Sequence, residues 1–135
     1  MSKIEQTLSI IKPDAVERNL DSQIKGIFLT NGFAIINEKK IKIEKSEAEK
    51  FYKVHETKPF YNDLCTYLSS GPIVVMILEK ENAIMANREL MGSTNPNDAK
   101  EGTIRKKFGI SIDKNSVHGS DSPENAKKEI NFFFK

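Results

Sequence analysis

The sequence predicts an α+β domain in which helices cover a four-stranded antiparallel sheet. An unbroken apolar run over residues 72–78 has the length of a strand that is covered on both faces. Residues 7–11 and 33–43 alternate apolar with polar residues and are rich in isoleucine, which is typical of strands. Between these segments, apolar residues recur three and four positions apart, which indicates amphipathic helices.

The first third of the chain reads as strand, helix, strand. Residues 7–11 form the first strand, and Pro13 ends it because proline biases the preceding residue toward an extended backbone. Ser22 is a candidate N-cap for the helix that follows, and Asn31 with Gly32 ends that helix. Residues 33–43 then form a second strand with one face in water.

Two short helices are expected next. Residues 46–49 (SEAE) match a capping box. The helix behind it places one stripe of apolar and aromatic residues toward the core, so His55 on that stripe reads as a packing or helix-end histidine. Pro59 breaks this pattern, and a second helix runs from Phe60 to its end at Ser70 and Gly71. Cys65 lies inside it, and we expect it to be a buried spacer, with a catalytic cysteine as the alternative.

The last half contains the central strand at 72–78, then a helix between Asn82 and Gly92. On this helix Arg88 shares an apolar row, so we expect it to have an anionic partner. Residues 92–115 are irregular except for a helical piece at 103–108. A short strand at His118 precedes a helix that begins at Pro123. The core order is therefore β-α-β-β-α-β, the ferredoxin-like arrangement.

Composition narrows the function classes. The chain has 135 residues, which fits a single domain over 1–135. Its 21 basic and 19 acidic residues give a net charge of +2, too mild to demand nucleic acid or membrane as a partner. A single cysteine cannot form an internal disulfide, and there is no apolar leader or transmembrane run. We expect a cytoplasmic protein.

The segment from Asn115 to Ser122 concentrates the candidate chemistry. His118 precedes Gly119, and two serines and Asp121 follow before the next helix begins. Backbone N–H groups at a helix N-terminus favour anions, so this is a candidate phosphate site. Ser120, His118 and Asp121 lie too close in sequence to converge as a catalytic triad. The histidine and cysteine spacings match no zinc signature, and no phosphate-binding glycine loop is present.

An imidazole among cationic side chains is suited to phosphoryl transfer. A histidine that titrates near ~6.5 is largely neutral and nucleophilic at neutral pH. Lys12, Arg88, Thr94 and Arg105 could hold phosphates, with Mg²⁺ on the nucleotide. A histidine nucleophile would divide the reaction into two steps with ping-pong kinetics. From the residues alone, His118 could equally be a polar residue at a strand end, and the arginines could be structural ion-pair partners.

The chain resembles the nucleoside diphosphate kinases over nearly its whole length. The most specific block is residues 115–122, Asn-x-x-His-Gly-Ser-Asp-Ser. The other blocks follow in the family's order: 11–15 (IKPDA), 51–52 (FY), 58–60 (KPF), 70–72 (SGP), 87–88 (NR), 91–96 (MGSTNP) and 102–105 (GTIR). The resemblance implies transfer of the γ-phosphoryl group of a nucleoside triphosphate, with Mg²⁺, to His118 and then to a nucleoside diphosphate.

The resemblance also implies a role for each matching residue. Glu129 would hold the second ring nitrogen of His118, with Ser120 and Asp121 lining the histidine. Tyr52 would support the transferred group, and Lys12 would reach the phosphate end or the ribose. The phosphates would be held by Arg88, Thr94 and Arg105, the sugar by Asn115, and the base by Phe60 with Leu64 and Ile112 as apolar walls. No side chain would bind the metal directly, because the nucleotide phosphates would carry it.

The sequence also departs from the family. Ser22 stands where glycine is frequent, and Tyr61 stands where a second phenylalanine is frequent. The chain ends soon after its last helix, without the longer tail of many eukaryotic members, and looks like a short bacterial-type member. Hexamers and tetramers both occur in the family, and we expect one of these homo-oligomers.

The competing hypothesis is a non-enzymatic ferredoxin-like module that binds a nucleotide or RNA. The same strand order serves RNA recognition, in which aromatic residues on the central strands stack on bases. Neither residues 7–11 nor residues 72–78 contain an aromatic residue. This favours the enzyme. Nucleic acid is not expected as the main partner.

Overall fold

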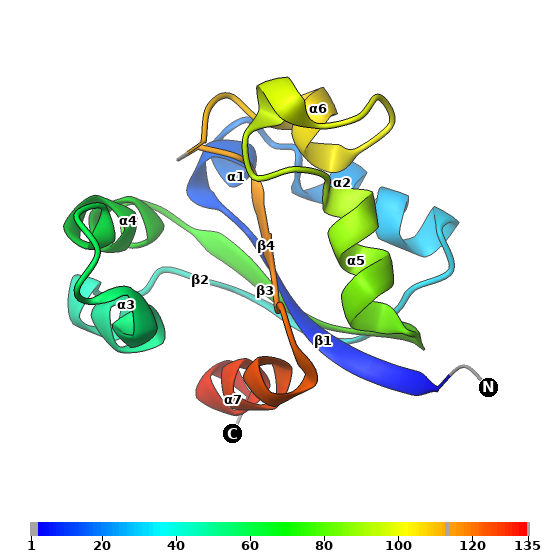
Figure 1. The fold of residues 1–135 in the computed structure, drawn as a ribbon, viewed down its shortest axis with the longest axis horizontal. Coiled ribbons are helices and arrows are strands. Elements are labelled where there is room, and N and C mark those ends of the chain that lie inside the picture. The colour runs from blue at the N-terminus through cyan, green and yellow to red at the C-terminus, as the bar shows by residue number, and fades with distance from the viewer. Residues whose placement is uncertain (1–2, 113, 135) are drawn as a thin grey trace.

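A four-stranded antiparallel sheet forms the centre of the molecule. We describe it from a computed structural model over residues 3–112 and 114–134. The strand order is β2-β3-β1-β4, and each neighbouring pair is antiparallel, which confirms the expected sheet (Figure 1). The strands are β1 (Ile4–Ile11), β2 (Ala34–Ile41), β3 (Ile73–Glu81) and β4 (Val117–Gly119).

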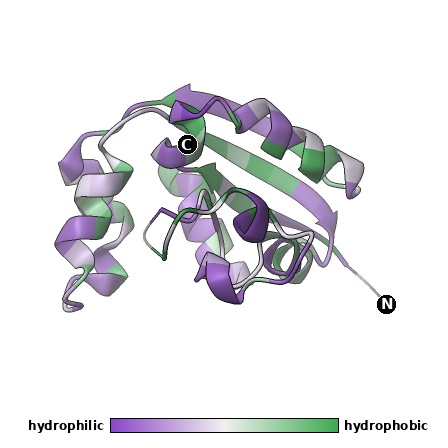
Figure 2. Ribbon diagram, turned by 90° about the horizontal axis from the view of Figure 1, so that it is seen from above, coloured by the Kyte–Doolittle hydropathy of each residue, from purple (hydrophilic) through white to green (hydrophobic). Residues whose placement is uncertain are grey.

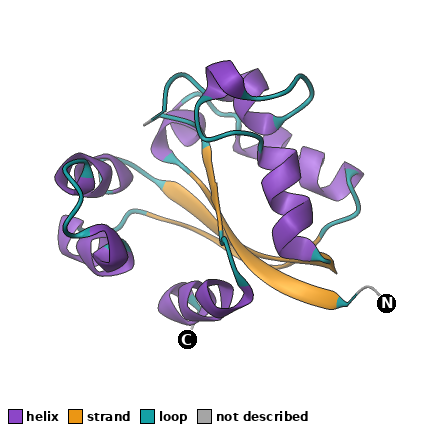
Figure 3. Ribbon diagram, viewed as in Figure 1, coloured by secondary structure: helices purple, strands orange, loops and turns teal. Residues whose placement is uncertain are grey.

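Helices cover both faces of the sheet (Figure 3). They are α1 (Pro13–Glu17), α2 (Asp21–Thr30), α3 (Lys45–Phe51), α4 (Tyr61–Leu68), α5 (Ala83–Met91), α6 (Ile104–Phe108) and α7 (Pro123–Phe133). Two short 3₁₀ turns are η1 (Lys53–His55) and η2 (Pro96–Asp98). Within the described part of the chain, no helix combines the length and the apolar character that crossing a membrane requires.

The sheet separates two hydrophobic cores. Leu8 and Ile10 of β1 face one core, which α3, α4 and α7 complete. Ile11 faces the other core, which includes Phe28 of α2 and Met91 of α5. Successive strand residues point to opposite faces, so β1 feeds both cores in turn. In β3, Ile73 and Val75 face the first core and Val74, Met76 and Leu78 face the second, and the middle of the sheet is hydrophobic (Figure 2).

The register of β4 against β1 decides which core His118 meets. His118 pairs with Ile10, so its side chain lies on the face that carries α3 and α7. Val117 pairs with Ile11 and joins the opposite core. The backbone N–H of Lys12 donates to the carbonyl of Ser116 at 2.8 Å, which continues the pairing beyond both strands.

Several helix boundaries agree with the expectations. Asn31 follows α2, and Gly32 adopts a positive φ of 87°. Asn82 precedes α5, and Gly92 ends it with the same φ value. In both cases glycine accepts a left-handed conformation that other residues adopt only with strain. The helix at Pro123 is also confirmed, and Ser122 caps it by accepting a hydrogen bond from the N–H of Asn125.

Two predicted caps are wrong. Helix α2 begins at Asp21 after Leu20, and Ser22 lies inside its first turn. The capping box of α3 is formed by Glu44 and Glu47 rather than by residues 46–49. A glutamate accepts from the same backbone N–H groups as serine, so a second box starting two residues earlier competes for the same turn. The sequence pattern could not distinguish the two.

Strand β2 is more exposed than a strand with one wet face. It lies at the edge of the sheet, and its register against β3 shifts between Ile35 and Asn37. The extra residue at the shift is Ile36, whose side chain is 49% exposed. Residues 37–40 beyond this bulge are all exposed, and the expected alternation holds only at the end of the segment, where Ile41 is half-buried and Ile43 is buried against the exposed Lys40 and Lys42.

Gly92 and Gly102 allow a matched test of the loop that follows α5. Both adopt a positive φ, so alanine at either position costs about 1–3 kcal/mol in backbone strain. A Cβ on Gly92 would also lie 2.6 Å from Oγ1 of Thr103, whereas a Cβ on Gly102 meets nothing within 4 Å. Gly92→Ala should therefore lower the denaturant midpoint further than Gly102→Ala. Equal midpoints would contradict this packing.

Candidate active site

His118 and Glu129 form the central pair of the candidate site. Nε2 of His118 lies 2.9 Å from Oε1 of Glu129, which comes from α7. The same carboxylate oxygen accepts a hydrogen bond from Oγ of Ser120 at 2.9 Å. A carboxylate at this distance favours the tautomer that carries its proton on Nε2, which leaves the lone pair on Nδ1. No hydrogen bond to Nδ1 involves the described residues.

Ser120 connects this pair to the sheet. It is fully buried, and its hydroxyl also accepts from the backbone N–H of Leu8 at 3.3 Å. Its own N–H donates to the carbonyl of Leu8 at 3.2 Å. Ser120 therefore fixes the position of Glu129 relative to β1, and through Glu129 it fixes the imidazole.

An aromatic cluster packs against one side of the imidazole. The ring of Phe51 lies edge-on to His118 at 5.4 Å between centroids. Phe132 and Phe133 of α7 pack on the other sides of Phe51, at 5.6 and 5.2 Å. The end of α3 and the last helix thus exclude water from one side of His118. The sequence placed Phe51 in the core stripe, but nothing in the pattern indicated contact with the histidine.

A cavity of about 260 Å³ opens beside His118. Tyr52 and His55, at the end of α3 and in η1, form one wall, and Asp121 lies on another. Burial raises the pKa of Tyr52, so its hydroxyl stays protonated at neutral pH. The amide of Asn125 donates to Asp121 at 2.6 Å and lowers the pKa of this carboxyl, which therefore stays ionised.

Lys12, which follows β1, and Asn115, which precedes β4, are hydrogen-bonded to each other. Both are buried, and Nζ of Lys12 donates to Oδ1 of Asn115 at 3.0 Å. The amide nitrogen of Asn115 donates to the carbonyls of Thr94 and Ile112, at 3.1 and 2.9 Å. Asn115 therefore ties the two ends of the irregular segment to the lysine, and the second lone pair of its oxygen remains for another donor.

Arg88, Thr94 and Arg105 line a second cavity, of about 860 Å³. Arg105 is buried and donates to the carbonyls of Gly92 and Val117, at 3.0 and 2.8 Å. Its buried Nε has no partner within the described structure. Burial, reinforced by the nearby Arg88, lowers the pKa of Arg105 to about 10. This is still above neutral pH, so the guanidinium remains a cation.

The expected apolar walls lie on two different segments. Phe60 precedes α4 and is 46% exposed, while Ile112 in the irregular segment is 54% exposed. Leu64 is half-buried against the core below α4. Large apolar side chains that remain exposed are candidates for contact with a ligand.

The expectation that Arg88 lies in an apolar stripe is wrong. The buried stripe of α5 consists of Ala83, Ile84, Asn87 and Met91, and Arg88 is exposed beside it. The described ion pairs do not include Arg88. Asn87 packs against the backbone of Gly119, where a Cβ would lie 2.3 Å from Nδ2 of Asn87. This close approach explains the glycine after His118.

These geometries define a class of site. An oriented histidine and the ionised carboxylate of Asp121 share a small cavity, two arginines line the second cavity, and a buried lysine bonds Asn115. Cationic side chains suit phosphate oxygens, and an imidazole with a lone pair on one ring nitrogen suits a phosphoryl acceptor. No group of three or more potential metal ligands occurs among residues 3–112 and 114–134. The fold is α+β, and the site has the features expected of a phosphate-binding protein with a candidate histidine nucleophile.

Comparisons with known proteins identify the family. The family model described as nucleoside diphosphate kinase matches residues 5–135. The chain is 59% identical to the nucleoside diphosphate kinase of Geotalea uraniireducens over 131 residues, which are 97% of this chain and 96% of that protein. It is 60% identical to the corresponding protein of Nitratiruptor sp. with the same coverage. The chain belongs to the nucleoside diphosphate kinase family.

Solved structures agree with this membership. The nucleoside diphosphate kinase of Aquifex aeolicus superimposes with a TM-score of 0.96 at 40% identity, covering 98% of this chain and 96% of that one. The apo enzyme of Encephalitozoon cuniculi gives 0.93 at 36% identity, covering 96% and 88%. The ferredoxin-like fold expected from the sequence is confirmed.

The tyrosines give a prediction at alkaline pH. Burial raises the pKa of Tyr52 and of Tyr67, and that of Tyr61 is also raised. In the unfolded chain these phenols ionise near ~10. As the pH rises above that value, the unfolded state loses protons that the native state keeps, so the free energy of unfolding decreases. Tyrosinate absorbance should therefore lag in native protein and increase together with unfolding. Half of the signal appearing near pH ~10, with the circular dichroism unchanged, would contradict this.

Proposed function

We propose that this chain is a nucleoside diphosphate kinase that works through a phosphohistidine on His118. It transfers the γ-phosphoryl group of a nucleoside triphosphate to a nucleoside diphosphate by a ping-pong mechanism. The observation that carries this assignment is the bond between Nε2 of His118 and Glu129, which leaves Nδ1 as the nucleophilic nitrogen.

In the first half-reaction, the lone pair of Nδ1 attacks the γ-phosphorus. The bond from that phosphorus to the bridging oxygen breaks, and the nucleoside diphosphate leaves with the bonding electrons. Glu129 retains the proton on Nε2 and stabilises the positive charge that develops on the ring. In the second half-reaction, a terminal oxygen of another diphosphate attacks the phosphorus, the P–N bond breaks, and the lone pair returns to Nδ1.

The cationic residues supply the electrostatic part of catalysis. Arg88, Thr94 and Arg105 line one cavity and would hold the phosphates. Lys12 would reach the phosphate end or the ribose, with Asn115 beside it binding sugar hydroxyls. The protonated hydroxyl of Tyr52 would support the transferred group beside His118.

Base selectivity should be weak. Phe60 would stack on the base, and Leu64 and Ile112 would form apolar walls. Stacking uses a π-face that every base has, and apolar walls do not distinguish hydrogen-bonding edges. This geometry supports the use of many nucleotides.

The residues present fit Mg²⁺ carried by the nucleotide. Both cavities have cationic and acidic side chains in their lining, and the described residues contain no group of three or more potential metal ligands. Asp121 and Glu129 are the carboxylates of the His118 cavity, and neither would bind the metal directly, because the nucleotide phosphates would carry it. When bound, Mg²⁺ neutralises phosphate charge. We also propose a single domain over 1–135, a cytoplasmic location and a homo-oligomer, hexamer or tetramer.

The RNA-binding alternative is not supported by the fold. RNA-recognition domains bind bases on an open face of their sheet. Here α2 and α5 cover one face and α3, α4 and α7 cover the other (Figure 1).

Incubation with ATP and Mg²⁺ alone tests the covalent step. The intact mass should increase by one phosphoryl group, the adduct should be acid-labile and alkali-stable, and a nucleoside diphosphate should remove it. His118→Ala should abolish both half-reactions. The comparison variant is His55→Ala: His55 is the other histidine of the chain and lines the same cavity, and this variant should still gain the phosphoryl group if His118 is the acceptor. Normal turnover of the His118 variant would overturn the assignment.

Glu129→Gln tests the orienting carboxylate. The amide keeps the shape but loses the charge that stabilises the developing imidazolium, so turnover should decrease at least about tenfold while phosphorylation still occurs. Glu124→Gln is the matched control, because Glu124 is exposed on the same helix. Equal turnover of the Glu129 and Glu124 variants would contradict the orienting role of Glu129.

A further inference from the structure

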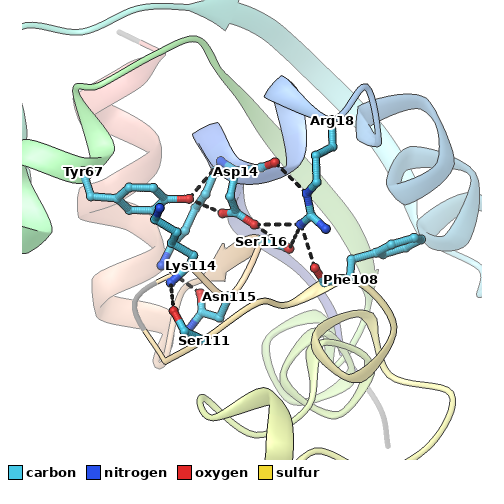
Figure 4. A network of polar contacts seen from close by, with 9 residues as sticks. Asp14, Arg18, Tyr67, Phe108, Ser111, Lys114, Asn115 and Ser116 are labelled. Carbon is cyan, nitrogen blue, oxygen red and sulfur yellow. Dashed lines mark hydrogen bonds and ion pairs between the residues drawn. The ribbon is translucent and has the colours of Figure 1, made fainter.

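Asp14 is a buried carboxylate outside the residues assigned to the nucleotide. It is the second residue of α1 and is 5% exposed. Three side chains donate to it: the hydroxyl of Tyr67, Nη2 of Arg18 at 3.0 Å and Oγ of Ser116 at 2.9 Å (Figure 4). A buried charge is stable only when it is paired and hydrogen-bonded, so this convergence fixes its position.

The donors come from segments far apart in sequence. Tyr67 lies on α4, and its oxygen also accepts from the backbone N–H of Asp14 at 2.8 Å. Arg18 follows α1 and also donates to the carbonyl of Phe108, at the end of α6, at 2.6 Å. Asp14 therefore holds α4, the end of α6 and the segment before β4 at one point.

Ser116 is the most constrained of these partners. It is fully buried and adopts a φ of +74°, a conformation that costs a non-glycine residue about 1–3 kcal/mol. Its hydroxyl bond to Asp14 stabilises this conformation. Its carbonyl accepts from the N–H of Lys12, and the preceding residue is Asn115, whose Oδ1 accepts from Nζ of Lys12. The conformation of Ser116 therefore sets how Lys12 and Asn115 meet.

We propose that Asp14, held by Tyr67 and Ser116, positions the Lys12–Asn115 pair for the nucleotide without touching it. The proposal rests on the proposed function. Asp14 makes no contact with His118 in the described structure. It acts through the backbone of Ser116 and through α4, the helix that carries Leu64 and follows Phe60. It thereby links the phosphate end of the site to the base end.

Tyr67→Phe removes one donor to Asp14 and keeps the ring. Tyr61→Phe is the matched control, because it is the same change on the same helix and removes a hydroxyl that donates to the carbonyl of Glu49 and interacts with Cys65, away from Asp14. We expect Tyr67→Phe to slow His118 phosphorylation at saturating ATP by at least about tenfold, since small misplacements of positioning groups are costly. Tyr61→Phe should phosphorylate at the wild-type rate.

A double-mutant cycle with Lys12→Ala separates positioning from general stability. If Asp14 acts through Lys12, Tyr67→Phe will have little further effect on the phosphorylation rate once Lys12 is removed. Independent, multiplying effects would overturn the proposal. So would equal rates for the Tyr67 and Tyr61 variants.

Ser116→Gly provides a second variant, which lacks the hydroxymethyl group that donates to Asp14 and accepts the positive φ without strain. It should slow phosphorylation as Tyr67→Phe does, and a wild-type rate would contradict the proposal. If wild-type protein itself does not become phosphorylated on His118, the proposed function fails. If wild type is phosphorylated and both variants match it, only the positioning proposal fails.

Discussion

The pairing of three residues of β4 with β1 determines the chemistry of this site. Because His118 pairs with Ile10, its side chain shares a face with Phe51 of α3 and Glu129 of α7. Side chains alternate along a strand, so a slip of one residue would turn the histidine toward α5. Gly119 then meets Asn87 on that opposite face, where a side chain would not fit. The register is thus fixed from both sides of the sheet.

The side chains of the proposed site are preorganised by hydrogen bonds within the protein. Ser120 holds Glu129, Glu129 holds His118, and Asn115 joins Lys12 to two carbonyls of the irregular segment. Arg105 is likewise fixed by two backbone carbonyls. Groups held in this way need little reorganisation as charge develops in a transition state. Ser116, one of the three donors to Asp14, lies between Asn115 and His118, and Arg18, another of them, also donates to the hydroxyl of Ser116.

Elements with strong local signals could be predicted from the sequence. The apolar run of β3, the glycines at 32 and 92 and the proline at 123 each act through one dominant effect. Predictions failed where two local solutions compete, as at the caps of α2 and α3, or where burial depends on tertiary contacts, as for Arg88. The Asp14 centre could not be predicted, because its partners lie 53 and 102 positions away in sequence. The residue pattern indicated His118 and the cationic side chains, the family resemblance assigned their roles and the remaining site residues, and the structure adds Phe51 and Asn87 beside them.

The position of the phosphoryl group on the imidazole tests the central claim most directly. Nε2 of His118 faces Glu129 at 2.9 Å, so Nδ1 is the nitrogen with an available lone pair. Nuclear magnetic resonance of ring-labelled protein distinguishes the two phosphohistidine isomers. The account predicts that protein phosphorylated by ATP carries the group on Nδ1 of His118. A phosphoryl group on Nε2, or on a residue other than His118, would contradict it.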